Sequence, residues 1–185
     1  MTGGGWIWSP LGAYIADPNL EAVIRETLNK GTDPLTAEDL QSLQNLQADN
    51  KGITELEGLQ YCTNLQILNL ADNSIVDVGV LRGLPNLFVL NLANNNIAEI
   101  YGLEAIPILH VLNLANNDVT DITVIGSLFN LFELHLENNN VSDISALSGL
   151  MLLQNVYLTG NPLSQESIDT LVPQLMGRGV QVFLT

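Results

Sequence analysis

The sequence is poor in positive charge: five lysines and arginines stand against 20 aspartates and glutamates, which gives a net charge of −15. A chain that negative repels the phosphate backbone of nucleic acids and the surface of anionic lipid. No run of about 18 apolar residues occurs, so no segment is expected to insert in a membrane. The one cysteine, Cys62, excludes an internal disulfide framework. We therefore expect an acidic protein with no nucleic-acid partner and no membrane insertion.

Sequence patterns of common catalytic sites are also missing. No glycine-rich phosphate loop follows a strand pattern, and no serine–histidine–aspartate grouping is found. The two histidines, His110 and His135, would lie roughly 11 Å apart on the predicted sheet, too far to share a zinc ion. Glu133 and Glu137 form a carboxylate pair in a polar strand, but nothing predicts a pocket around them. We expect no enzymatic activity, no metal site and no cofactor.

The sequence contains instead a repeat of 22 residues. Three segments spell LNLADNS (68–74), LNLANNN (90–96) and LNLANND (112–118). One unit of this length cannot bury its own apolar side, so the units must stack and share a continuous core. No insertion breaks the step over six units. One apolar column of the repeat reads Leu46, Leu68, Leu90, Leu112, Leu134 and Val156.

Each unit begins with an alternating LxxLxL pattern, which predicts a short strand, followed by a sharp bend. We expect a column of asparagines at this bend to bond the backbone groups that the bend leaves open. We expect a second, acidic column to cap short helical turns on the outer face. The asparagine column is Asn73, Asn95, Asn117, Asn139 and Asn161. The acidic column is Glu55, Asp77, Glu99, Asp121 and Asp143.

Both ends of the repeat array have the pattern of a cap. Residues 17–31 predict an amphipathic helix that Asp17 and Pro18 begin and Gly31 ends. A second short helix is expected in 35–43, with Thr36 as its N-cap. After the repeats, a helix capped by Ser164 is expected to bend or break at Pro173, and residues 180–184 to add a last strand.

These patterns carry a family resemblance. The 22-residue unit, the entry stretch LQADNKGITELEGLQYCTNLQILNLADNSI (46–75) and the ending GNPLSQESIDTLVPQLMGRGVQVFL (160–184) resemble bacterial leucine-rich repeat proteins of the internalin-like class. The resemblance covers about residues 16–185. It implies a curved domain of a bacterial surface or secreted protein that binds another protein with its concave side.

The predicted fold is a right-handed α/β solenoid with a parallel sheet on the concave face and loops with short 3-10 turns on the convex face. Residues 16–185 are expected to form one leucine-rich repeat domain: a helical N-cap (16–42), six repeats (43–163) and a helix–strand C-cap (164–185). Residues 1–15 are expected to be a tail, either flexible or left by cloning. Cys62 falls in an apolar column and is expected in the core.

In this fold the second, third and fifth residues of each unit line the concave sheet. Because neighbouring strands lie about 4.8 Å apart, Phe88, His110 and Phe132 can stack as a ladder. An apolar and aromatic patch bordered by amides is typical of a protein contact site, unless a cap or the tail covers it. The predicted partner-binding residues are Ile67, Phe88, Val89, His110, Val111, Phe132, Glu133, His135 and Tyr157.

The sequence thus favours a monomeric, non-enzymatic module that binds another protein through its concave face. One alternative is a passive spacer or scaffold in a larger bacterial surface protein. Another is a carbohydrate- or calcium-binding module that uses the acidic and amide columns. The resemblance implies a secreted or cell-surface location as part of a longer protein, and a cytoplasmic location is the alternative.

Overall fold

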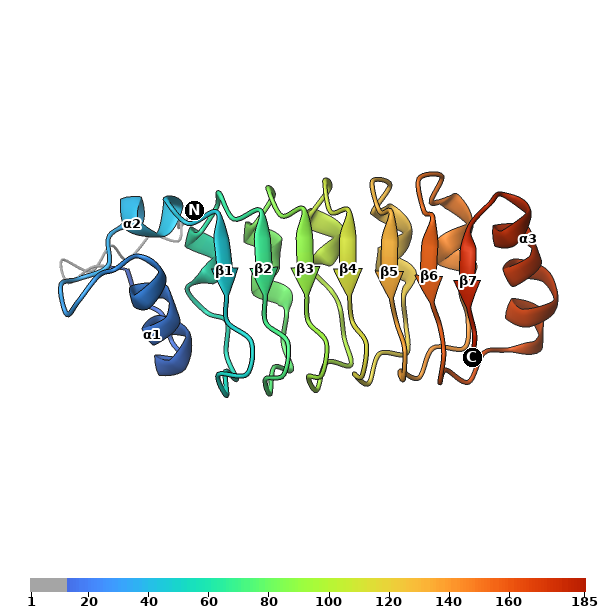
Figure 1. The fold of residues 1–185 in the computed structure, drawn as a ribbon, viewed down its shortest axis with the longest axis horizontal. Helices are drawn as coiled ribbons and strands as arrows, with labels where there is room; N and C mark the ends of the chain where they lie inside the picture. Colours follow the sequence, from blue (N-terminus) through green and yellow to red (C-terminus); the bar gives the residue numbers. More distant parts are fainter. Residues whose placement is uncertain (1–12) are drawn as a thin grey trace, which may run out of the picture.

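The alternating opening of each unit forms a strand of three residues, and the strands lie side by side in sequence order (Figure 1). The computed structural model describes residues 13–185. All strand pairs in this range are parallel. The strands are β1 (Asn45–Gln47), β2 (Ile67–Asn69), β3 (Val89–Asn91), β4 (Val111–Asn113), β5 (Glu133–His135), β6 (Asn155–Tyr157) and β7 (Gln181–Phe183).

Short helices form the opposite side of the solenoid and its two ends (Figure 1). Five 3-10 turns pack behind the sheet: η1 (Leu59–Tyr61), η2 (Gly79–Gly83), η3 (Leu103–Ala105), η4 (Thr123–Ser127) and η5 (Ser145–Gly149). The ends carry α1 (Pro18–Thr27), α2 (Ala37–Gln41), the π-helical turn η6 (Ser167–Leu171) and α3 (Val172–Gly177). The predicted fold class, with its helical N-cap and helix–strand C-cap, is confirmed.

The core lies between the sheet and the 3-10 turns. The register places Leu68 beside Leu90 and Leu90 beside Leu112, so one apolar column runs along the solenoid. These leucines are fully buried, as is Cys62. Each buried leucine contributes about 1.5–3 kcal/mol relative to an exposed one. The continuous core therefore depends on the 22-residue step, which keeps every apolar side chain against its counterpart in the next repeat.

The asparagine column bonds the backbone at every bend, as predicted. The Nδ2 group of Asn117 donates to the carbonyl of Leu114 in its own repeat (3.0 Å) and to that of Leu92 in the preceding one (2.9 Å). Its Oδ1 accepts the N–H of Ile97 (3.0 Å). Asn95 donates to the same Leu92 carbonyl (3.0 Å), so consecutive asparagines share an acceptor. The side chains form a continuous ladder of bonds between repeats, which we call the asparagine ladder.

A neighbouring column, which the sequence analysis did not single out, has left-handed backbone. Asn94 and Asn116 have φ values of 57° and 56°, a conformation that asparagine tolerates better than most residues. The Nδ2 group of Asn94 also donates to Oδ1 of Asp72 in the repeat before (2.9 Å). The full left-handed column is Asn50, Asp72, Asn94, Asn116, Asn138 and Gly160. The paired asparagines of the repeat thus do two jobs: one allows the bend and the next bonds its backbone.

Three aspartates of the acidic column hold the start of an outer turn. The carboxylate of each aspartate accepts the N–H group of the residue two positions later, and that residue is the first of the 3-10 turn. The aspartate itself lies one residue before the N-cap. The capping prediction is confirmed for these three repeats. The pairs are Asp77–Gly79 (2.7 Å), Asp121–Thr123 (2.8 Å) and Asp143–Ser145 (2.7 Å).

The same prediction is wrong for Glu55 and Glu99, whose side chains accept no hydrogen bond within residues 13–185. Their longer side chains do not close the tight ring that an aspartate forms with the backbone two residues on. In the Glu99 repeat the turn begins at Gly102, with φ 105°, and the Gly102 N–H donates to Oε2 of Glu104 (2.6 Å). Gly58 has the same role in the Glu55 repeat, with φ 109°. The convex face therefore uses two kinds of turn.

The N-terminal helices begin where the sequence predicts. Asp17 caps α1, and Thr36 and Asp39 form a capping box at α2. The expected end of α1 at Gly31 is wrong: the helix ends at Thr27, and the left-handed residue behind it is Asn29 (φ 51°). Part of the expected tail, 1–12, lies outside the described residues. Ile15, which the sequence assigns to that tail, is buried in the core.

Asp17 also ties the N-terminal cap to the first repeat. Its Oδ1 accepts the N–H groups of Asn19 and Leu20, and its Oδ2 accepts those of Thr54 and Glu55. Burial raises the pKa of Asp17, but the four N–H groups favour the ionised carboxylate and together lower the pKa below its ordinary value. The cap is therefore held to the repeats by an ionised carboxylate.

We predict that acid weakens this cap. In the folded protein the pKa of Asp17 is lowered, and Lys30 bonded to Asp39 lowers the pKa of Asp39 to about 2 from 3.8. The stability that these groups contribute is therefore fully present above about pH 5 and is lost as the pH falls from about 4 toward 2. Urea unfolding across that range should show a smaller pH dependence for Asp17→Asn than for the wild type.

Asp33→Asn is the matched control, because Asp33 is exposed and its side chain accepts no hydrogen bond within residues 13–185. Its urea midpoint should follow the wild-type pH dependence. An Asp17→Asn protein with a pH dependence equal to that of the wild type would contradict the role assigned to Asp17.

The C-terminal cap differs from its prediction in one respect. Ser164 caps the helix, because its Oγ accepts the N–H of Ser167 (3.1 Å). The helix does not break at Pro173 but continues through the π-helical turn η6 directly into α3. A wider turn ahead of a proline leaves room for its ring and needs no N–H from it. The last strand, β7, pairs in parallel with β6 as predicted.

Candidate functional site

The sheet face is the surface that the exposed side chains of the strands form on the side away from the 3-10 turns. All nine residues predicted to bind a partner lie on it, in or directly before β2 to β6. The register aligns Ile67, Val89 and Val111 with Glu133 in one column. A second column aligns Asn113 with His135 and His135 with Tyr157. The parallel register therefore converts the spacing of the sequence into neighbouring rows of side chains.

The predicted aromatic ladder is present. The ring centroids of Phe88 and His110 lie 4.7 Å apart, and those of His110 and Phe132 lie 5.1 Å apart, each pair inclined by 10°. The side chain of Phe88 is 45% exposed, although it could have folded under the edge of the sheet. Neither described cap covers these rings. Stacked aromatic groups on a rigid sheet offer a large contact area at a small cost in conformational entropy.

A second aromatic ladder was not predicted. His135, Tyr157 and Phe183 stack in that order, with centroids 4.2 Å and 4.4 Å apart. The sequence analysis included the first two residues but missed Phe183. Phe183 follows Tyr157 by 26 residues instead of 22, so the repeat step does not give the register of β7. The site extends further toward the C-terminal cap than the sequence indicates.

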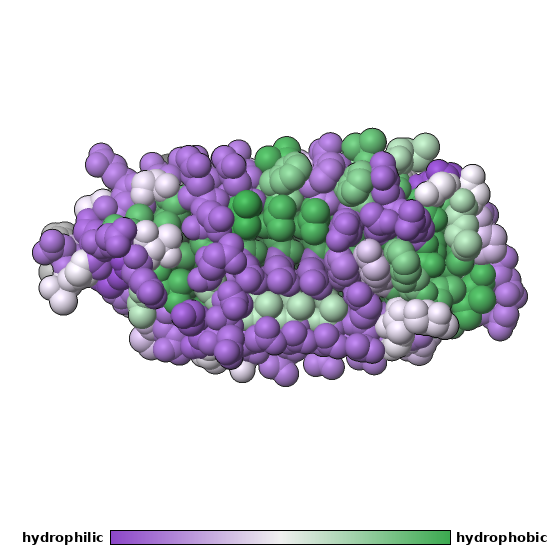
Figure 2. Space-filling model, in the orientation of Figure 1, coloured by the Kyte–Doolittle hydropathy of each residue, from purple (hydrophilic) through white to green (hydrophobic). Residues whose placement is uncertain are grey.

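Apolar side chains gather at the centre of the sheet face. Figure 2 shows hydrophobic residues over β2 to β4, with hydrophilic residues on both sides of them. Ile67 is 38% exposed, and Val89 and Val111 are half-buried. Burying apolar surface of this kind is favourable by about 25 cal/mol for each square ångström removed from water.

Two carboxylates and a histidine gather on the sheet face at β5 and directly after it. Nε2 of His135 lies 2.7 Å from Oε1 of Glu133, and its Nδ1 lies 3.3 Å from Oε1 of Glu137. The other carboxylate oxygen of Glu137 is buried and has no hydrogen-bond partner within residues 13–185. Alternate residues of a strand share a face, so the alternation indicates this group. Glu133 and His135 were both predicted on the sheet face, but the contact of His135 with the two glutamates was not. Both carboxylates thus lie next to the ring nitrogens of His135, beside the second ladder.

A row of amides borders the apolar centre. The Oδ1 atoms of Asn91 and Asn113 accept the N–H groups of Ala93 (3.1 Å) and Ala115 (2.9 Å). Their Nδ2 groups have no acceptor among the described residues and face outward from the sheet. Amide groups fixed in this way can bond polar groups of a partner while the neighbouring apolar side chains are buried.

Comparisons with known sequences agree with the repeat. The family model described as Leucine Rich repeat matches residues 61–81. Internalin C of Listeria monocytogenes is 34% identical to the chain over 65 residues. That match spans 34% of this chain and 22% of internalin C.

Solved structures match over most of the chain. An internalin (inlF) of L. monocytogenes has a TM-score of 0.74 at 24% identity, over 95% of this chain and 57% of its own. Internalin C2 of the same species has a TM-score of 0.64 at 27% identity, over 96% of this chain and 97% of its own. A leucine-rich repeat protein of Leptospira interrogans has a TM-score of 0.72 at 25% identity, over 78% of this chain and 38% of its own.

The chain has the leucine-rich repeat fold and resembles bacterial proteins of the internalin-like class. The resemblance given by the repeat and by the two caps is therefore confirmed. Internalin-like repeat folds typically serve protein–protein interaction and belong to recognition proteins that are not enzymes. In this internalin-like protein, apolar and aromatic rows lie side by side on the sheet face.

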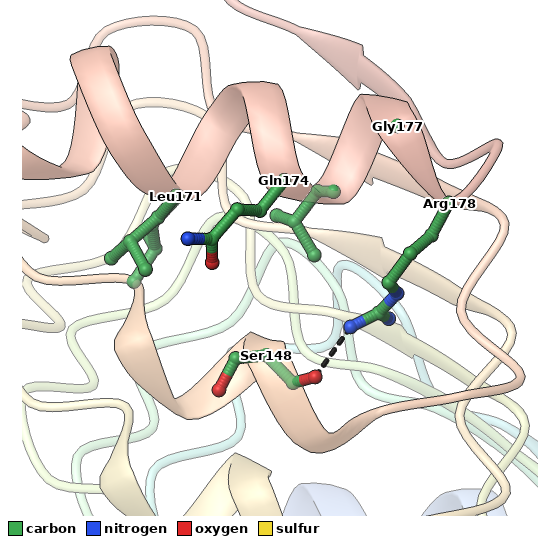
Figure 3. Close-up of a pocket in the computed structure, with 7 residues that line it drawn as sticks. Ser148, Leu171, Gln174, Gly177 and Arg178 are labelled. Carbon is green, nitrogen blue, oxygen red and sulfur yellow. Dashed lines mark hydrogen bonds between the residues drawn. The ribbon is translucent and has the colours of Figure 1, made fainter.

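A hollow in this internalin-like protein lies away from the sheet face, at the C-terminal cap. It lies between η5 and α3, has a volume of about 480 Å³, and is shown in Figure 3 with the side chains that line it. Arg178 crosses it from the end of α3 and donates to the carbonyls of Ser148 and Leu150. Gln174 and Leu171 point from the helical segment toward the 3-10 turn (Figure 3). The hollow is the seam where the C-terminal cap docks on the last repeat.

The single thiol of this internalin-like protein, that of Cys62, is buried in the core. Burial raises the pKa of the Cys62 thiol to about 12, so it is not a thiolate nucleophile at neutral pH. In the part of the chain that the structure describes, no three His, Cys, Asp or Glu side chains group as metal ligands. Within the same residues, no helix is long and apolar enough to cross a membrane.

Proposed function

We propose that the sheet face binds another protein, with Phe88, His110 and Phe132 at the centre of the contact. The observation that carries the proposal is a pair of adjacent rows on the sheet face: a stacked aromatic ladder and, beside it, three branched apolar side chains. Phe88 and Ile67 are exposed in these rows, and the other members are half-buried. Aromatic anchors dominate many protein contacts. Val89, Val111, Glu133, His135 and Tyr157 surround the centre, and Ile67 extends it toward β1.

The wider setting of the proposal comes from the relatives. Two of these relatives, inlF and internalin C, are longer than this chain. We therefore propose that the repeat domain (16–185) works as part of a longer secreted or cell-surface protein. It binds as a monomer, because a net charge of −15 opposes contact between two copies. The competing function is a passive spacer, in which the exposed rings would have no partner.

The test of binding is a double substitution, Phe88→Glu with Phe132→Glu. We expect a partner captured by the wild type from a bacterial host or culture mixture to bind the variant about 100-fold more weakly or not at all, because both anchors are lost. Both rings are partly exposed, so the melting temperature should change little. Capture followed by surface plasmon resonance measures the difference.

The chain offers a matched control off the sheet face. Phe129 and Met151 are 64% and 77% exposed and lie in the loops that lead into β5 and β6. Phe129→Glu with Met151→Glu makes the same change of charge and polarity and should leave binding intact. If the two double variants bind alike, or if the wild type retains nothing that a blank surface does not, the sheet face is not the site and the spacer function is favoured.

A further inference from the structure

The charge on the sheet face has one sign. Glu133 and Glu137 lie on its β5 side, and Asp49 lies on its β1 side, where its carboxylate accepts from Nδ2 of Asn69 (3.0 Å). The apolar centre over β2 to β4 therefore has carboxylates on both sides. A partner that buries this centre must bring its own surface close to these carboxylates.

The basic residues of the chain lie elsewhere. Lys30 bonds Asp39 in the N-terminal cap, and Arg25 pairs with Glu21 on α1 (2.8 Å). Arg82 donates to the carbonyl of Gly79 in η2, and Arg178 donates to that of Ser148 in η5. Lys51 lies in the bend that follows β1. None of the five lies in a strand, and within the described residues none forms an ion pair with Glu133, Glu137 or Asp49.

The position of Glu133 suits a long cationic side chain. The register places it next to Val111, and Phe132 precedes it in the chain at the end of the first ladder. Lysine and arginine carry an apolar stem and a charged head. Such a stem can lie on Val111 and the ring of Phe132 while its head reaches the carboxylate of Glu133. The charge and the apolar row are thus arranged for one kind of residue.

We propose that the partner docks on the sheet face with a cationic, apolar segment: hydrophobic side chains for the row Ile67, Val89 and Val111, and a lysine or arginine for Glu133 and Glu137. This inference rests on the proposed function and names the chemistry of its partner. Charge complementarity selects this occupant over a second copy of the chain, which would bring a net charge of −15 to a surface of the same sign.

Random peptides displayed on phage test the inference without knowledge of the natural partner. Peptides are selected on the wild type, on Glu133→Gln/Glu137→Gln, on Phe88→Glu/Phe132→Glu, and on the control Glu26→Gln/Glu166→Gln. The control removes two exposed carboxylates from the helical caps. We expect peptides from the wild type and the control to be enriched in lysine and arginine together with apolar residues. The same peptides should bind Glu133→Gln/Glu137→Gln about tenfold more weakly.

Glu133→Lys sharpens the test, because reversing the charge should replace basic by acidic residues in the selected peptides. The results separate the inference from the function on which it rests. Peptides that need Phe88 and Phe132 but show no basic enrichment overturn the cationic partner and leave the binding face standing. Peptides that bind Phe88→Glu/Phe132→Glu as well as the wild type, or a selection no better than on a blank surface, overturn both.

Discussion

Asn117→Ala should lower the free energy of unfolding by about 2–4 kcal/mol. The Asn117 side chain bonds the backbone of its own repeat at Leu114 and that of the repeat before at Ile97 and Leu92. It is only 7% exposed, so water does not readily replace it. A buried backbone group left without its partner costs about 1–3 kcal/mol, and this change affects more than one.

Asn96 provides the control for Asn117. It lies in the same kind of bend one repeat earlier and is exposed, and its side chain makes no hydrogen bond among the described residues. Asn96→Ala should change stability by no more than about 0.5 kcal/mol. Urea unfolding followed by circular dichroism measures both variants. If Asn117→Ala is as stable as Asn96→Ala, the asparagine ladder does not hold the repeats together.

Gly102→Ala should destabilise the protein by about 2–4 kcal/mol. Gly102 has a φ of 105°, which side chains of L-residues rarely adopt. An added Cβ would also lie 3.0 Å from the carbonyl oxygen of Gly79 and 3.1 Å from its Cα. Both atoms belong to the backbone of the adjacent repeat, so the strain cannot be relieved by a side-chain rotation.

Gly149→Ala is the matched control for Gly102, because Gly149 ends the 3-10 turn η5 and a Cβ there would meet nothing within 4 Å. It should be neutral or slightly stabilising, since alanine restricts the unfolded chain more than glycine does. Thermal unfolding of the two variants side by side decides the matter. A Gly102→Ala protein that melts with Gly149→Ala would contradict the strained turn assigned to the Glu99 repeat.

The fold could be predicted from the sequence because the 22-residue step relates every repeat to the next. Once Leu68, Leu90 and Leu112 are assigned to the core, the alternation of the strand places Val89 and Val111 on the opposite face. The first aromatic ladder follows from the same step. These predictions needed only the period of the repeat and the alternation of side chains along a strand.

The rest depended on backbone geometry that the period does not contain. Aspartate and glutamate occupy the same column, but only the shorter side chain reaches the N–H two residues on, so the turn at Gly102 was not foreseen. The C-terminal cap interrupts the step, and the register of Phe183 with Tyr157 came from the pairing of β7 with β6. The sequence therefore did not predict the second ladder, although it placed two of its rings, His135 and Tyr157, on the sheet face.

Most of the positions that hold each repeat together differ from the positions that face outward. In the fourth repeat, Leu112 and Asn117 fix the interior, whereas His110 and Val111 have no part in it. The interior can thus stay constant while the outward positions vary. A gene for such a chain can acquire new recognition by point mutations at three positions per repeat, or by duplication of 66 nucleotides, without having to evolve a new fold.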